Sequence, residues 1–108
     1  MSIKRITTIV PMDFLDSLEK CLRAAGVPGM TIDNVRGFGE HANYFSNDLL
    51  RSNVRIEVYI GERRCEEVCE AICKFAKETH TSAGILAIES VDRLIDLNTG
   101  REVLTENL

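Results

Sequence analysis

The most constraining feature of this sequence is the strict alternation of polar and apolar side chains over residues 53–60. A period of two is typical of a β-strand with one buried and one polar face. The strand therefore needs other elements to cover its apolar side, while its polar side includes one large aromatic residue, Tyr59. The buried face is predicted to consist of Val54, Ile56, Val58 and Ile60.

Three further strands and two helices are predicted around this segment. β-Branched and apolar runs predict the strands, and apolar side chains that recur every three or four residues predict the helices. Asp13 is expected to cap the first helix, and Gly26 to end it. The strands are expected at Arg5–Val10, Met30–Val35 and Ile85–Ile88, and the helices at 14–25 and 62–78.

The resulting order, β-α-β-loop-β-α-β, predicts an α+β fold of the ferredoxin-like type with an antiparallel sheet. A chain of 108 residues is expected to form one domain, so we assign residues 1–108 to a single domain. Two helices cover only one face of such a sheet. The other face carries both Tyr59 and Val35 among polar residues, which favours packing against partner subunits.

Charge and hydropathy narrow the classes of function. The formal net charge is −4, and no basic run is interleaved with aromatics, so nucleic-acid binding is not expected. No apolar stretch approaches the roughly 18 residues needed to span a bilayer. The N-terminus shows no signal-peptide pattern. We therefore expect a cytoplasmic protein that is not inserted in a membrane.

A pair of glycines follows the strand predicted at 30–35. Gly37 and Gly39 flank Phe38, and such a strand end exposes backbone N–H groups that suit an anionic or flat ligand. An ordinary tight turn or bulge accounts for the same pattern. Residues 40–52, which follow, are polar and without periodicity.

The four cysteines have two interpretations. Cys65, Cys69 and Cys73 are spaced four apart, and on a helix they share most of one apolar arc, which favours small core residues. The alternative is a soft-metal site that uses these thiols together with His80. Their drift around the helix works against that site, so no metal ligand is assigned.

No residues form a recognisable catalytic arrangement. The sequence has no nucleophile paired with a base and no Walker motif. Two acids, Glu57 and Asp96, lie near the expected ligand site, and a structural or solvated role is favoured for both. The chain is therefore predicted not to be an enzyme and to have no catalytic cofactor.

The chain resembles the PII signal-transducer superfamily over nearly its whole length. The residues that carry the resemblance are Gly29-Met30-Thr31 with Val35-Arg36-Gly37-Phe38-Gly39, then Arg55-Ile56-Glu57-Val58, and the stretch 91–100. The resemblance implies a homotrimer whose three inter-subunit clefts each bind an adenine nucleotide. It also implies that residues 40–52 correspond to the T-loop, which docks on a partner, and that residues 99–108 form a C-terminal tail.

The resemblance assigns a set of site residues by position. Glycines would admit the base and sugar, while Ile9, Phe38 and Tyr59 would supply apolar or stacking surface. A core or sheet-edge role is the alternative for those three. The implied nucleotide-binding residues are Ile9, Thr31, Gly37, Phe38, Gly39, Tyr59 and Gly84.

The phosphate-binding residues of the superfamily are largely missing. Its lysine before the fourth strand is absent, and Asp96 and Asn98 stand where two arginines are usual. Charge-assisted contacts to phosphate are lost and an acid replaces one of them. We therefore expect AMP, ADP or a cyclic nucleotide in preference to Mg-ATP. Whether Arg101, Lys77 or Arg93 compensates stays open.

The expected T-loop also departs from that of nitrogen regulators. It is shorter and lacks their modified tyrosine, so uridylylation is not expected. The residues assigned to effector or partner contact are Glu40, His41, Tyr44, Leu49, Leu50 and Arg51.

The divergent branches of the superfamily suggest the kind of partner. We expect a membrane transporter, with bicarbonate or inorganic-carbon transport favoured and bicarbonate as a second possible ligand, as in the carboxysome-associated branch. A metal-responsive protein beside heavy-metal efflux pumps and a nitrogen-regulatory PII protein are the alternatives.

Overall fold

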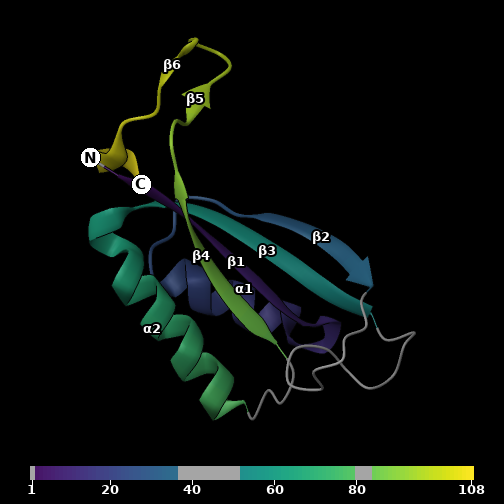
Figure 1. Cartoon of the computed structure of the whole chain (residues 1–108). Coiled ribbons are helices and arrows are strands. Elements are labelled where there is room, and N and C mark those ends of the chain that lie inside the picture. Colours follow the sequence, from purple (N-terminus) through teal and green to yellow (C-terminus); the bar gives the residue numbers. More distant parts are fainter. Residues whose placement is uncertain (1, 37–51, 80–83) are drawn as a thin grey trace.

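The computed structural model describes residues 2–36, 52–79 and 84–108 and has two layers (Figure 1). One layer is an antiparallel sheet with strand order β2-β3-β1-β4, and the other consists of two helices. A small hairpin, β5–β6, extends beyond one end of the sheet. The sheet strands are β1 (Ile3–Pro11), β2 (Thr31–Arg36), β3 (Ser52–Gly61) and β4 (Ile85–Val91); the helices are α1 (Leu15–Ala24) and α2 (Glu62–Glu78); the hairpin strands are β5 (Ile95–Asp96) and β6 (Arg101–Glu102); short 3-10 turns span Met12–Phe14 and Thr105–Asn107. The predicted α+β, ferredoxin-like order with an antiparallel sheet is confirmed.

The core lies between the sheet and the helices. Strands β1 and β3 pair over nine residues, from Ile3 opposite Gly61 to Pro11 opposite Asn53. This pairing places Ile6 and Val10 of β1 beside the apolar residues of β3, on the face that the helices cover, whereas Ile9 lies on the opposite face. The residues predicted to be buried in β3, Val54, Ile56, Val58 and Ile60, are all buried.

The helices complete this core with one apolar stripe each. In α1 the buried side chains are Leu18 and Leu22, one helical turn apart. In α2 they run along the whole helix. Phe14, just before α1, meets the ring of Phe75 edge-on, with 6.4 Å between ring centroids. The buried residues of α2 are Cys65, Val68, Cys69, Ile72 and Phe75.

Several predicted boundaries were wrong. Asp13 does not cap the first helix, because it lies inside the Met12–Phe14 turn and Phe14 occupies the N-cap position without a side-chain bond. The first strand includes Pro11, and the fourth runs on to Val91, because pairing with β1 extends it beyond its own apolar run. Ser52, assigned to the loop, belongs to β3.

One arginine joins the ends of the two helices. The guanidinium of Arg64, in the first turn of α2, donates to the carbonyls of Ala25 (2.5 Å) and Gly26 (3.0 Å). Gly26 has a φ of 79°, which a side chain would disfavour, and it turns the chain from α1 toward β2. Arg64 also donates to the carbonyl oxygen of Leu108 (3.4 Å). Arg64 thereby links the turn that ends α1 to the last residue of the chain.

Within the described residues, no helix is long and apolar enough to cross a membrane.

Two truncations on α1 should separate core from surface. Leu22→Ala should lower the free energy of unfolding by about 2–5 kcal/mol, because a fully buried side chain leaves a cavity. Lys20→Ala is the control, since Lys20 is on the exposed side of the same helix and its truncation should change that free energy by less than about 0.5 kcal/mol. Urea denaturation at one fixed protein concentration measures both. Equal effects would contradict the assigned core.

Candidate functional site

The candidate site is an open groove of about 410 Å³, named here the Thr31–Tyr59 groove. Its walls come from three parts of the chain: the turn that enters β2, the uncovered face of β3, and the C-terminal residues. The described residues that line it are Pro28, Gly29, Met30, Thr31, Glu57, Tyr59, Leu94, Ile95, Asp96, Val103 and Leu108.

Strand register explains how the sheet wall is built. Thr31 is the first residue of β2 and lies directly opposite Glu57 of β3. Residues opposite one another in an antiparallel pair share a face, and Tyr59 follows two residues later on that same face. The polar positions of the alternating pattern therefore form the groove side of β3, whereas its apolar positions face the helices.

The β5–β6 hairpin supplies the second wall. The carboxylate oxygen Oδ1 of Asp96 accepts a hydrogen bond from the backbone N–H of Asn98 (2.8 Å), and the Asp96 carbonyl accepts one from Gly100 (2.7 Å). Gly100 has a φ of 70°, which suits glycine in this turn. Val103 closes the hairpin by donating its N–H to the Leu94 carbonyl (2.8 Å). The turn thus holds Ile95 and Asp96 at the groove.

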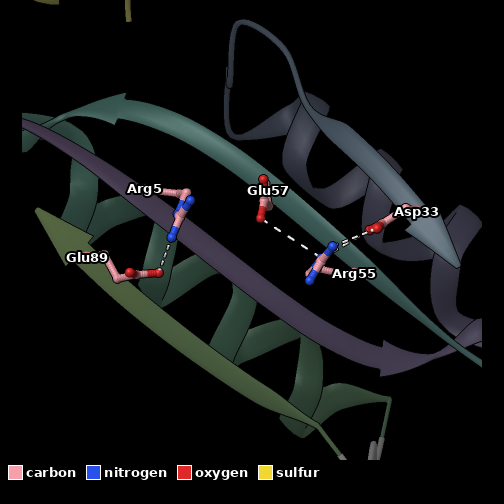
Figure 2. Close-up of polar contacts among 5 residues, drawn as sticks. All are labelled: Arg5, Asp33, Arg55, Glu57 and Glu89. Carbon is pink, nitrogen blue, oxygen red and sulfur yellow. Dashed lines mark hydrogen bonds and ion pairs between the residues drawn. The ribbon is translucent and has the colours of Figure 1, made fainter. Parts of the chain in front are cut away.

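Ion pairs lie on the face of the sheet that the helices do not cover (Figure 2). The guanidinium of Arg55 donates to both carboxylate oxygens of Asp33, at 3.2 and 2.7 Å, and Arg5 donates to Glu89 at 2.7 Å. Hydrogen bonding and charge from Glu89 raise the pKa of Arg5, and those from Asp33 raise the pKa of Arg55. Glu57 lies 4.0 Å from the Arg55 Nε. Arg5 and Arg55 are therefore each engaged by a carboxylate.

The structure brings together two of the predicted nucleotide-binding residues. Thr31 and Tyr59 both line the groove. Ile9 is not among the described lining residues and lies on the same sheet face, opposite Arg55 and Ile85. Gly84 immediately precedes β4. The remaining nucleotide-binding residues, Gly37, Phe38 and Gly39, lie outside the described residues. So do all the residues assigned to effector or partner contact: Glu40, His41, Tyr44, Leu49, Leu50 and Arg51.

Sequence reasoning did not assign several residues that line the groove. Met30 belongs to the motif that carried the resemblance, but nothing in the local sequence around it indicated that it would line a site. Leu94, Val103 and Leu108 come from the polar C-terminal region, where isolated apolar residues are the one available signal. Glu57 and Asp96 were noted as acids near the site and both line it.

The three cations considered as replacements for phosphate-binding residues do not line this groove. Arg93 is paired with Glu102, with 2.6 Å between Nε and the carboxylate. Arg101 lies opposite Asp96 in the hairpin register. Lys77 is in the last turn of α2. Among the described residues that line the groove there is no lysine, arginine or histidine.

Sequence comparisons find relatives over nearly the whole chain. Residues 3–101 match the family described as nitrogen regulatory protein P-II. A nitrogen regulatory protein P-II from Pasteurella multocida is 28% identical over 109 residues, which cover 93% of this chain and 96% of the relative. Nitrogen regulatory protein P-II 2 from Methanothermobacter thermautotrophicus is 30% identical over 105 residues, which cover 91% of each chain. A nitrogen regulatory protein P-II from Pyropia yezoensis is 28% identical, covering 90% of this chain and 93% of the relative.

The core role predicted for the three cysteines of α2 is confirmed for Cys65 and Cys69 and is wrong for Cys73, which was placed at the edge of the apolar arc. Cys65 and Cys69 are buried in α2, and Cys73 is exposed on the same helix. Burial, followed by the charge of Cys65, raises the pKa of the Cys69 thiol to about 12. Cys21 donates its thiol to the Ala71 carbonyl (3.6 Å). His80 lies outside the described residues, and within those residues no three potential ligands form a metal-binding group.

Thiol reactivity should separate these cysteines. At pH 8 we expect Cys73 to react rapidly with Ellman's reagent, while Cys65 and Cys69 react after denaturation, because Cys69 stays protonated and both are buried. Stopped-flow absorbance measures the phases, and Cys73→Ser should remove the fast one. Rapid reaction of Cys69 in the folded protein would contradict the assigned packing.

Proposed function

Because the chain belongs to the nitrogen regulatory protein P-II family, we propose that it binds an adenine nucleotide in the Thr31–Tyr59 groove and relays that binding to a partner protein. As a member of this family it is a signal transducer and not an enzyme, as the sequence predicted. The observation that carries the proposal is the convergence of Thr31 and Tyr59. These two residues, assigned by resemblance, line one groove from adjacent strands.

The chemistry of the groove supports a purine ligand. Its apolar side chains, among them Met30 and Leu94, provide surface for a flat base, and the Tyr59 ring adds aromatic area. The Thr31 hydroxyl offers both a donor and an acceptor to base nitrogens. The lack of a cation among the described lining residues supports AMP, ADP or a cyclic nucleotide over Mg-ATP.

The ligand-competent form is proposed to be a homotrimer with clefts between subunits. The uncovered sheet face and the apolar residues of the C-terminal region support this, since both leave surface for a neighbouring copy. Three large apolar side chains of that region are exposed in the single chain: Ile95, Leu97 and Leu104. Large exposed apolar residues that gather on one surface are typical of protein contacts.

The partner is proposed to be a membrane transporter, with inorganic-carbon transport favoured and bicarbonate as a second ligand. Docking would use residues 40–52, in the cytoplasm. Residues 37–51 connect β2 and β3, both of which contribute to the groove. A ligand that contacts Thr31 and Glu57 would therefore act on the two strands from which this segment emerges.

Nucleotide binding is tested by isothermal titration calorimetry. We expect AMP and ADP to bind more tightly than Mg-ATP, and cyclic AMP is included as a further probe. Thr31→Ala should weaken AMP binding roughly tenfold, the effect of losing one hydrogen bond inside a groove. Tyr59→Phe should bind better than Tyr59→Ala, because it keeps the ring. Ser17→Ala, on the exposed side of α1, is the control. Absence of binding by every adenine ligand would refute the proposal.

A second candidate is the nitrogen-regulatory role, favoured by the printed names of the relatives. The two roles differ in their response to 2-oxoglutarate. We expect that adding 2-oxoglutarate leaves the affinity for Mg-ATP unchanged, because the sequence lacks the phosphate lysine of nitrogen regulators. Calorimetry of Mg-ATP with and without 2-oxoglutarate measures this. A marked gain in affinity would instead support nitrogen sensing.

A further inference from the structure

One arginine links two walls of the Thr31–Tyr59 groove from outside it. The guanidinium of Arg64 donates through Nη2 to the Ala25 carbonyl (2.5 Å) and through Nη1 to the Gly26 carbonyl (3.0 Å). The same Nη1 donates to the carbonyl oxygen of Leu108 (3.4 Å), a residue that lines the groove. Pro28, another lining residue, comes shortly after Gly26 in the chain. Arg64 itself is not among the described lining residues, so it contacts the walls and not the space between them.

The guanidinium is held in one orientation by its own helix. Its Nε donates to the carboxylate of Glu67 (2.8 Å), which lies in the next turn of α2. Gly26 leaves room for the opposite edge of the group, because an added Cβ there would lie 3.1 Å from the Arg64 Nη2. All three guanidinium nitrogens are therefore engaged, in a planar arrangement that a lysine, with its single nitrogen, does not reproduce.

The C-terminal wall of the groove has little buried surface to fix its position. The last residues lie beside the first turn of α2 (Figure 1). None of the residues in the Thr105–Asn107 turn is buried, and Leu104, just before it, is 56% exposed. The turn lies against Gly61, where an added Cβ would come within 3.2 Å of the Thr105 carbonyl oxygen. Because a segment with so little buried apolar surface opens locally at low cost, its position depends on polar contacts such as the one from Arg64.

We propose that Arg64 is a positioning residue of the Thr31–Tyr59 groove. It holds the turn between α1 and β2 and the C-terminal segment in the arrangement that accepts a ligand, and it does so without contacting the ligand. This inference rests on the proposed function, because the ligand is the adenine nucleotide proposed for the same groove. In thermodynamic terms, Arg64 keeps the binding-competent arrangement populated before the ligand arrives.

Loss of these hydrogen bonds should lower the affinity by lowering that population. The apparent dissociation constant equals the intrinsic one divided by the competent fraction, so a fall of that fraction to about a tenth weakens binding about tenfold. The ligand must then order the C-terminal segment itself. Ligand and arginine thus act on the same equilibrium, and removal of the arginine increases the effect of the ligand on it.

Calorimetric titration with AMP tests the effect on affinity. Arg64→Met keeps an apolar stem and removes every donor, so AMP binding should weaken roughly tenfold. Arg64→Lys keeps the charge and one nitrogen, so its affinity should lie between those of Arg64→Met and the unaltered protein. Arg63→Met is the matched control, since it removes the same charge from an exposed neighbour that does not line the groove, and it should bind AMP as the unaltered protein does.

Hydrogen–deuterium exchange separates positioning from general stability. Without ligand, Arg64→Met should speed exchange in residues 103–108 and leave β1 and β3 protected. At saturating AMP, the gain in protection of residues 103–108 should be larger in Arg64→Met than in the unaltered protein, because the ligand then supplies the order that the arginine supplied. A purely structural role would speed exchange in the central strands as well.

The outcomes distinguish this inference from the proposed function. If the unaltered protein binds AMP and Arg64→Met binds it equally well, or if residues 103–108 exchange alike in both, the positioning role is overturned while nucleotide binding stands. An equal loss of affinity in Arg63→Met would assign the effect to charge and overturn it too. If Arg64→Met does not fold, Arg64→Lys decides in the same way. If no adenine ligand binds the unaltered protein, the proposed function fails and the positioning role fails with it.

Discussion

The antiparallel pairing of β1 with β3 is the constraint on which the rest of the structure depends. These strands occupy the centre of the sheet, and each pairs with one edge strand, β4 and β2 respectively. Their nine-residue register places Ile6 opposite Val58 and Thr8 opposite Ile56 on the face that the helices cover. A slip of one residue would turn the apolar set of either strand toward the other face. Burial of apolar side chains between the sheet and the helices therefore fixes the register. The register in turn determines which residues lie on the uncovered face.

The ion pairs on the uncovered face orient their side chains but add little to the free energy of unfolding. Arg5 with Glu89 and Arg55 with Asp33 are cross-strand pairs at short distances, yet their side chains are about a third or more exposed. Exposed pairs of this kind contribute at most about 1 kcal/mol each. Their larger effect is to occupy the guanidinium groups near the groove. Each guanidinium is paired with a carboxylate of a neighbouring strand, so its positive charge is less available to attract an anion.

The sequence predicted what local periodicity determines. The buried face of β3 and the bounds of α2 followed from the alternation and from the helical spacing. The length of β4 did not, because residues beyond Ile88 have no strong pattern and are held by pairing with β1. In the site, resemblance selected Thr31 and Tyr59. Contributions from Leu94, Val103 and Leu108 depend on how the C-terminal region folds back, and that tertiary contact leaves no local pattern.

At Asp96, the fold accounts for one property of the side chain, its hydrogen-bonding oxygen, but not for another, its negative charge. Its turn requires a side-chain oxygen that accepts from the N–H two residues later, and asparagine meets that need as well as aspartate does. The hairpin also lies outside the hydrophobic core, so a change of charge there has little cost to the fold. Folding therefore explains the oxygen at this position and leaves the negative charge unexplained. Under the proposed function, this carboxylate would lie at a wall of the ligand groove, where its effect would be on the ligand rather than on the turn.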